Sequence, residues 1–78
     1  MARYPEIYSK AQWGTARRAA LVRDNGLCQE CLKKGIVKPG TEVHHVTELS
    51  DDNKHDWNIA YNIDNLVTLC MECHSNIH

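Results

Sequence analysis

Two identical cysteine pairs constrain this 78-residue chain more than any other feature of its sequence. Cys28-x-x-Cys31 and Cys70-x-x-Cys73 stand on either side of the central part of the chain. A two-residue gap lets both thiolates of a pair bind one ion without strain, and two such pairs complete a closed tetrahedral Zn²⁺ site. We therefore expect one structural zinc ion with no open position for chemistry. The alternatives are two local redox pairs or disulfides, but the sequence has no thioredoxin-like context.

The length of the chain makes such a metal site useful. A domain of this size buries only about 60% of the surface that its unfolded chain exposes, so apolar burial alone stabilises it weakly. Bound zinc would supply folding free energy. The sequence contains no long apolar run and starts without an apolar signal segment. We expect a cytoplasmic protein without a membrane segment, in a compartment where reduced thiols hold metal.

Charge is distributed unevenly along the chain, although the formal net charge is only −1. Residues 1–38 carry eight basic and three acidic side chains, whereas residues 39–78 carry one basic and seven acidic. All five histidines also lie in the second half. This pattern favours a polyanion-binding surface beside a cation site, and the alternative is a solvated surface with accidental segregation. The candidate phosphate-binding residues are Arg17, Arg18, Arg23, Lys33 and Lys34.

The first half of the chain predicts one helix over residues 10–24. Ser9-Lys10-Ala11-Gln12 has the form of a capping box, and Asn25-Gly26 supplies a left-handed stop. Apolar residues recur between them at helical spacing, namely Trp13, Ala16, Ala20 and Leu21. Trp13 is expected to pack in the core, and the alternative is an exposed tryptophan that stacks on a nucleic-acid base.

The second half predicts short strands, a long loop and a terminal helix. Ile36-Val37 and 41–46 are β-prone runs separated by a Pro-Gly turn, and 41–46 is the better strand. Residues 47–64 are rich in Asp and Asn and predict a long loop. A further strand is expected over 66–69 and a helix over 70–78. Three loop residues are expected to fasten the loop to the core, or alternatively to wedge into DNA: Trp57, Ile59 and Tyr61.

The histidine spacing indicates a second metal site. His74 and His78 are four residues apart, so their rings project from one face of a helix and could share a metal ion. His44 and His45 are adjacent on a strand and must point to opposite faces. One of these two could bind the metal while the other acts as a base near pH 7. His55 lies in the polar loop and is expected to be solvated.

At this point the motifs resemble a known family, the His-Asn-His (HNH) nucleases. The resemblance rests on Val43-His44-His45-Val46, Asp64-Asn65-Leu66 and Leu69-Cys70-x-x-Cys73-His74, followed by His78, and covers about residues 28–78. The cysteine pairs are similar to the zinc-bearing Cys₄ branch, and the early Trp and Arg helix is similar to small phage-type members. The histidine and asparagine pattern is also similar to the nuclease domains of DNase colicins, which lack the four cysteines.

The resemblance implies an α+β fold with a ββα-metal (His-Me finger) core. In one domain over residues 1–78, an N-terminal helical segment (1–27) would precede the zinc knuckles and core (28–78). The resemblance further implies that His45 is the general base. Asn65 would hold the loop and orient His45. His44, His74 and His78 would bind one catalytic divalent cation. Many relatives carry Asp at the position of His44, which suits Mg²⁺, whereas an all-imidazole site favours Mn²⁺, Ni²⁺ or Zn²⁺.

We therefore predict a metal-dependent DNA endonuclease that leaves 5′-phosphate and 3′-hydroxyl ends, as the resemblance implies. The competing class is a non-catalytic zinc-binding module that contacts DNA or protein, and a third is a zinc-dependent thiol protein. One active site cuts one strand, so double-strand cleavage would need a homodimer or two encounters. The phage-type resemblance makes a terminase a candidate partner, although no residue of the sequence indicates one.

Overall fold

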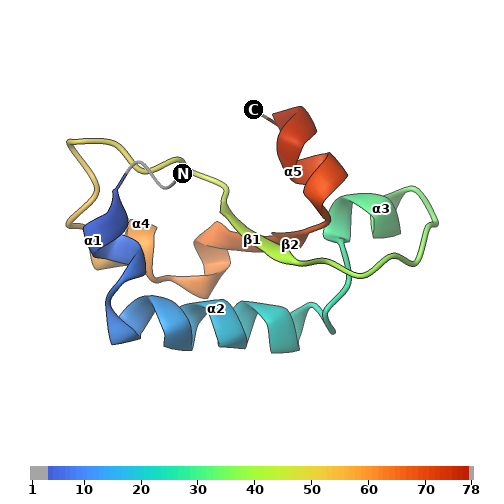
Figure 1. Cartoon of the computed structure of the whole chain (residues 1–78), viewed down its shortest axis with the longest axis horizontal. Helices are drawn as coiled ribbons and strands as arrows, with labels where there is room; N and C mark the ends of the chain where they lie inside the picture. The colour runs from blue at the N-terminus through green and yellow to red at the C-terminus, as the bar shows by residue number, and fades with distance from the viewer. Residues whose placement is uncertain (1–3, 78) are drawn as a thin grey trace.

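A short antiparallel sheet of two strands lies at the centre of the protein (Figure 1). The computed structural model describes residues 4–77. Strand β1 (Glu42–His45) pairs with β2 (Leu66–Leu69), in a register that places Glu42 opposite Leu69 and His45 opposite Leu66. The helices, in chain order, are α1 (Pro5–Tyr8), α2 (Ala11–Arg23), α3 (Gln29–Lys33), α4 (Trp57–Ala60), the 3₁₀ helix η1 (Ile63–Asn65) and α5 (Met71–Ile77). This arrangement confirms the predicted α+β class.

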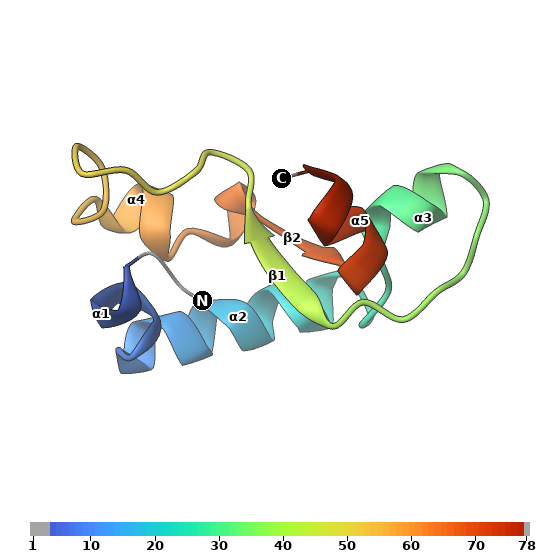
Figure 2. The same ribbon diagram turned by 45° about the horizontal axis from the view of Figure 1, so that its top comes forward.

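The helices cover the two sides of the sheet differently. Helix α2 runs along one side, and α5 stands on the other (Figure 1). Helices α1 and α4 lie together at one end of the molecule, whereas α3 and α5 lie together near the other end (Figure 2). Within residues 4–77, no helix combines the length and the apolar character needed to cross a membrane.

Among residues 4–77, the buried apolar side chains form three small clusters instead of one large core. One cluster joins α1 to α4, a second joins α2 to β2, and the third contains cysteines of both knuckles. Their members are Tyr4, Ile7 and Ala60; Ala16, Ala20 and Leu66; and Cys28, Cys31, Leu69 and Cys70. Such small clusters bury little apolar surface each, as expected for a chain of this length.

Helix α2 confirms the predicted helix over 10–24 to within one residue at each end. Asn25 and Gly26 both have positive φ, 56° and 66°, as the predicted left-handed stop requires. The predicted capping box is wrong, because Lys10 occupies the N-cap position without a side-chain cap. Ser9 instead ends α1, where its hydroxyl donates to the Glu6 carbonyl at 3.1 Å.

Residues 47–64 are not the uninterrupted loop that their composition predicts. The Asp56 carboxylate accepts the Asn58 amide at 2.9 Å and caps α4, and the Asn62 side chain accepts the Asp64 amide at 2.9 Å and caps η1. Asp and Asn favour helix N-caps as well as loops, because their short side chains accept backbone amide hydrogens. The residues that indicated a loop therefore start two short helices.

Two apolar segments are more exposed than the sequence predicts. Ile36 and Val37 lie outside any strand and are 52% and 74% exposed. Trp57 is 59% exposed and meets the Tyr61 ring edge-on, with ring centroids 5.6 Å apart. The prediction that Trp57 fastens the loop to the core is therefore wrong. Tyr61 does contribute, since its hydroxyl donates to the Ile7 carbonyl at 3.2 Å. His55 is exposed, as predicted.

A buried carboxylate connects the end of α2 to the sheet. Asp24 accepts two hydrogen bonds from the Arg23 guanidinium, at 2.9 and 3.0 Å, and one from the Thr68 amide at 3.1 Å. Arg23 also donates to the Leu66 carbonyl at 2.6 Å and to the Ile63 carbonyl. The Arg23 hydrogen bond and the Thr68 amide hold the pKa of Asp24 below its usual range, against the opposing effect of burial. The charged form of Asp24 therefore stabilises the fold.

Asp24→Asn should lower the free energy of unfolding at pH 7 by about 1–3 kcal/mol, because buried charge-assisted hydrogen bonds are lost. Since folding lowers the pKa of Asp24, its contribution is present above the unfolded pKa, about 4, and is lost as the pH falls further. The difference between the variant and the wild type should therefore shrink below about pH 4. Urea unfolding followed by circular dichroism measures this. Asp52→Asn, at an exposed position, is the control. Equal stability of Asp24→Asn and the control at pH 7 would contradict the assignment.

Candidate functional site

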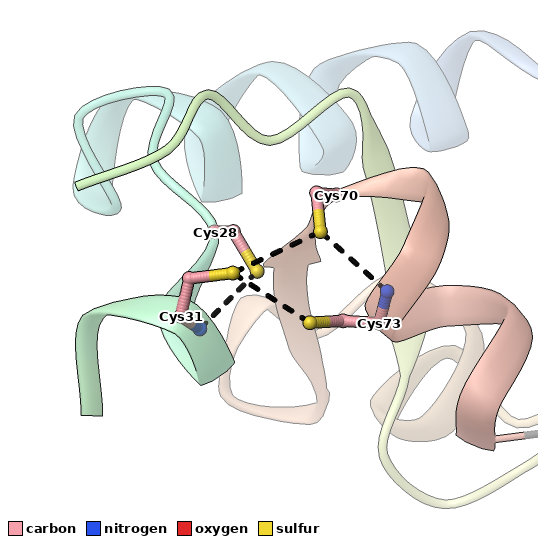
Figure 3. A group of neighbouring side chains, drawn as sticks. All are labelled: Cys28, Cys31, Cys70 and Cys73. Atoms are coloured by element: carbon pink, nitrogen blue, oxygen red, sulfur yellow. Dashed lines mark hydrogen bonds between the residues drawn. The ribbon is translucent and has the colours of Figure 1, made fainter. Parts of the chain in front are cut away.

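The four cysteines of the two Cys-x-x-Cys pairs come together in a single cluster (Figure 3). Their Sγ atoms all lie within 4.8 Å of one another. The Cys31 Sγ atom is 3.7 Å from that of Cys73 and 3.9 Å from that of Cys70. A tetrahedral ion with Zn–S bonds of about 2.3 Å would separate its sulfur ligands by about 3.8 Å. The cluster therefore fits one tetrahedral metal ion.

Both cysteine pairs use the first turn of a helix to orient their sulfurs. The amide of Cys31 in α3 donates to Cys28 Sγ at 3.4 Å, and the amide of Cys73 in α5 donates to Cys70 Sγ at 3.5 Å. Burial works to raise the pKa of Cys28, but backbone amides lower it to about 6 overall. Contact with Cys70, burial and the sulfurs of Cys28 and Cys31 together raise the pKa of Cys73 to about 12. Four sulfurs this close can all be ionised only with a cation between them.

The two adjacent histidines of β1 contact different parts of the structure, as their positions on a strand predict. The His44 ring meets that of His74 in α5 edge-on, with ring centroids 5.5 Å apart. His74 takes this position because α5 begins directly after β2, and its amide donates to the Cys70 carbonyl at 3.0 Å. Imidazoles at this distance are a suitable donor pair for one divalent ion.

A cleft of about 280 Å³ contains these rings. His44, His45 and His74 line it together with Glu48 and two tyrosines, Tyr4 and Tyr8. His78, the third histidine expected to bind the catalytic metal, lies outside the described residues. The structure thus brings together in one cleft three of the four histidines that the family resemblance implicates.

His45 is buried, with only 5% of its surface exposed, and a hydrogen bond holds its ring. The Nε2 atom lies 2.9 Å from the Ala60 carbonyl oxygen, which can only accept, so Nε2 carries the hydrogen. The neutral ring therefore has its lone pair on Nδ1. Burial lowers the pKa of His45, although the bond to Ala60 acts in the opposite direction. A neutral imidazole with a defined tautomer can accept a proton near pH 7.

Asn65 closes the base of the loop between the strands. Its Oδ1 accepts the Thr47 amide at 2.8 Å, and its Nδ2 donates to the carbonyls of Thr47 at 3.2 Å and Ile59 at 2.8 Å. Ile59 precedes Ala60, whose carbonyl accepts from His45. The Asn65 side chain therefore fixes the backbone that holds the His45 ring.

The five candidate phosphate-binding residues have different surroundings. The Arg23 guanidinium donates to Asp24 and to backbone carbonyls. Arg17 donates to the Thr41 carbonyl at 3.4 Å. Lys33 pairs with Glu30 at 3.2 Å. Arg18 and Lys34 are exposed on α2 and just after α3. The charge pattern alone did not separate Arg23, whose guanidinium stabilises the fold, from the exposed cations.

Sequence reasoning did not place two aromatic residues beside His45. Trp13 stacks on the His45 ring with centroids 5.2 Å apart and ring planes 23° apart, and Tyr8 approaches the ring edge-on at 6.0 Å. The helical spacing of Trp13 indicates burial, and Trp13 is half-buried against the cluster of Ala16, Ala20 and Leu66. No sequence signal indicated that its partner is a histidine of β1.

Comparison with known proteins agrees with this arrangement. A model of the HNH endonuclease family matches residues 28–78. The chain is 43% identical over 68 residues to a probable HNH endonuclease of Lactococcus phage SK1, covering 87% of this chain and 70% of that protein. It also resembles the crystal structure of an HNH endonuclease of the deep-sea thermophilic bacteriophage GVE2 with manganese ion.

That structural match has a TM-score of 0.82 and 33% identity, and it covers 96% of this chain and 77% of the other. The family match covers more than half of the chain, and the Lactococcus phage protein is similar over most of its length. The chain therefore belongs to the HNH endonuclease family.

Proposed function

We propose that this protein is a metal-dependent DNA endonuclease that hydrolyses phosphodiester bonds with His45 as general base. The observation that carries the proposal is the cleft in which a buried, neutral His45 lies beside the His44 and His74 pair. Phosphodiester hydrolysis requires activation of a water on one side of phosphorus and stabilisation of negative charge on the other. These histidines provide residues for both tasks within one cleft.

His45 is suited to the proton transfer. Its Nε2–H is held by the Ala60 carbonyl, so Nδ1 is the atom that accepts a proton from the attacking water. Asn65 acts on His45 indirectly, because its hydrogen bond to the Ile59 carbonyl fixes the segment that orients His45. Asn65 is therefore a positioning residue in this proposal.

The candidate ligands of the catalytic cation are His44, His74 and His78. Bound there, a divalent cation would stabilise negative charge on the phosphate and the leaving oxygen. The GVE2 endonuclease was crystallised with manganese ion, which supports testing Mn²⁺ first. Imidazole ligands also suit Ni²⁺ and Zn²⁺, and Mg²⁺ belongs in the same comparison.

A nicking assay on supercoiled plasmid tests the base. With Mn²⁺, the wild type should convert the plasmid, whereas His45→Ala should lose at least about 100-fold in rate, as expected for loss of a general base. His55→Ala is the matched control, because His55 is an exposed histidine outside the cleft. Nicks that DNA ligase can reseal would show 5′-phosphate and 3′-hydroxyl ends. Equal rates for His45→Ala and the control would overturn the assignment of the base.

We propose further that the cysteine cluster holds a structural Zn²⁺, for which the sulfur separations are the supporting observation. Cys28→Ser should lose the tightly bound zinc and most of its cooperative thermal unfolding, because metal binding supplies folding free energy. Elemental analysis and calorimetry measure both. His44→Ala, which changes only the proposed catalytic site, should retain one zinc per chain. Unchanged zinc content in Cys28→Ser would contradict the structural role.

DNA is the proposed substrate, and the exposed cations are the proposed phosphate contacts. Replacing both Arg18 and Lys34 by Gln should lower the slope of log affinity against log salt by about 2, because each phosphate contact contributes about one unit. Fluorescence anisotropy with a short duplex and Ca²⁺ in place of the catalytic ion measures this slope. Lys54→Gln, in the acidic half of the chain, is the control. A slope that the double variant leaves unchanged would remove these two residues from the interface.

A further inference from the structure

Two aromatic residues from the N-terminal helices lie against the proposed base, although they precede the segment that the family model matches. The Trp13 ring stacks on His45 at 5.2 Å, with the two ring planes only 23° apart. Tyr8 approaches the same imidazole at 6.0 Å and 71°, and it meets Trp13 edge-on at 4.9 Å and 88°. The three rings thus form one aromatic cluster.

The contacts on His45 restrain different motions of its ring. The Ala60 carbonyl holds the Nε2 edge at 2.9 Å and so selects the tautomer with the lone pair on Nδ1. Trp13 covers a face of the ring and so restrains its tilt. Tyr8 contacts both Trp13 and His45 and supports the stack from the side. Without Trp13, the hydrogen bond to Ala60 would still allow the ring to pivot about it.

The helices that carry these aromatic residues are held in place by tertiary contacts. The Ile7 carbonyl in α1 accepts the Tyr61 hydroxyl at 3.2 Å, and the Tyr4 hydroxyl donates to Asp51 Oδ1 at 3.1 Å. Trp13 also packs against the cluster of Ala16, Ala20 and Leu66. The stack on His45 is therefore part of a set of packed and hydrogen-bonded contacts that joins the N-terminal helices to the sheet.

We propose that Trp13 is a positioning residue that holds the His45 imidazole in the orientation for proton transfer, with Tyr8 as its support. The inference rests on the proposed function, in which His45 is the base. It assigns to the N-terminal helices a part in the reaction, whereas the family match begins only at residue 28. A misplaced base lowers the rate of the chemical step without weakening the binding of DNA.

Trp13→Phe and Trp13→Leu form the decisive pair, because both remain apolar but only Phe keeps a flat ring to stack on His45. We expect Trp13→Leu to lower kcat at least about tenfold with KM changed less than about twofold, while Trp13→Phe stays within about threefold of the wild type. Val22→Ala is the control on the same helix, since Val22 is 77% exposed. Zinc content and thermal unfolding of each variant identify losses of folding.

A second measurement reports on the ring itself. Long-range ¹H–¹⁵N correlations should show one His45 tautomer, protonated at Nε2, in the wild type and in Trp13→Phe. In Trp13→Leu the same spectra should still show this tautomer, because Ala60 still accepts from Nε2, but the His45 ring signals should be exchange-broadened because the ring pivots about that bond. A tryptophan that only packs in the core would lower the stability of both variants without broadening the His45 ring signals, and that result would overturn the proposal.

Failure of this inference differs from failure of the proposed function. If His45→Ala is inactive but Trp13→Leu and Trp13→Phe have equal kcat, the base stands and the positioning role is overturned. If His45→Ala retains wild-type activity, the base itself is wrong and the positioning role falls with it. In the His45→Ala background, Trp13→Leu should cause no further loss, because it acts through the ring that has been removed.

Discussion

The cluster of four cysteine sulfurs is the constraint on which the rest of this structure depends. It joins two elements that are far apart in the sequence, the turn that begins α3 and the turn that begins α5. Because Cys70 directly follows β2, the cluster also holds one end of the sheet. His74 directly follows Cys73 and so lies beside His44. The cysteine cluster thereby helps to place a candidate ligand of the catalytic cation.

Hydrogen bonds of polar side chains add to the connections that the small apolar clusters make between elements. The Arg23–Asp24 pair connects α2 to β2 and η1 through backbone groups, and Asn65 closes the loop between the strands. Arg23 and Asn65 each bind two or more backbone groups, and Asp24 binds the Thr68 amide. These side chains therefore replace contacts that a larger protein would make with an extended core. The Asn65 link leads to the cleft, because Asn65 holds the segment before Ala60 and the Ala60 carbonyl holds His45.

Prediction from the sequence succeeded where local spacing is sufficient. Helix α2, strand β2 and helix α5 follow from periodicity and turn residues, and they lie where these patterns predict. Helices α1 and α4 are each four residues long, which is too short for a hydrophobic period to be recognised. The capping-box pattern places Ser9 at the start of α2, whereas Ser9 ends α1, a helix too short for the sequence pattern to indicate. Trp57 is exposed, and its ring meets that of Tyr61, at the end of the same short helix, edge-on.

The sequence by itself determined that the two cysteines of each Cys-x-x-Cys pair could share a metal ion, because their relative positions are set by backbone geometry over a few residues. It also determined that His44 and His45 face different sides of their strand. Only the tertiary structure decided which nitrogen of His45 carries the hydrogen and which ring covers it. Those features come from Ala60 and Trp13, which are distant in sequence, and contacts of that kind depend on how the helices pack against the sheet.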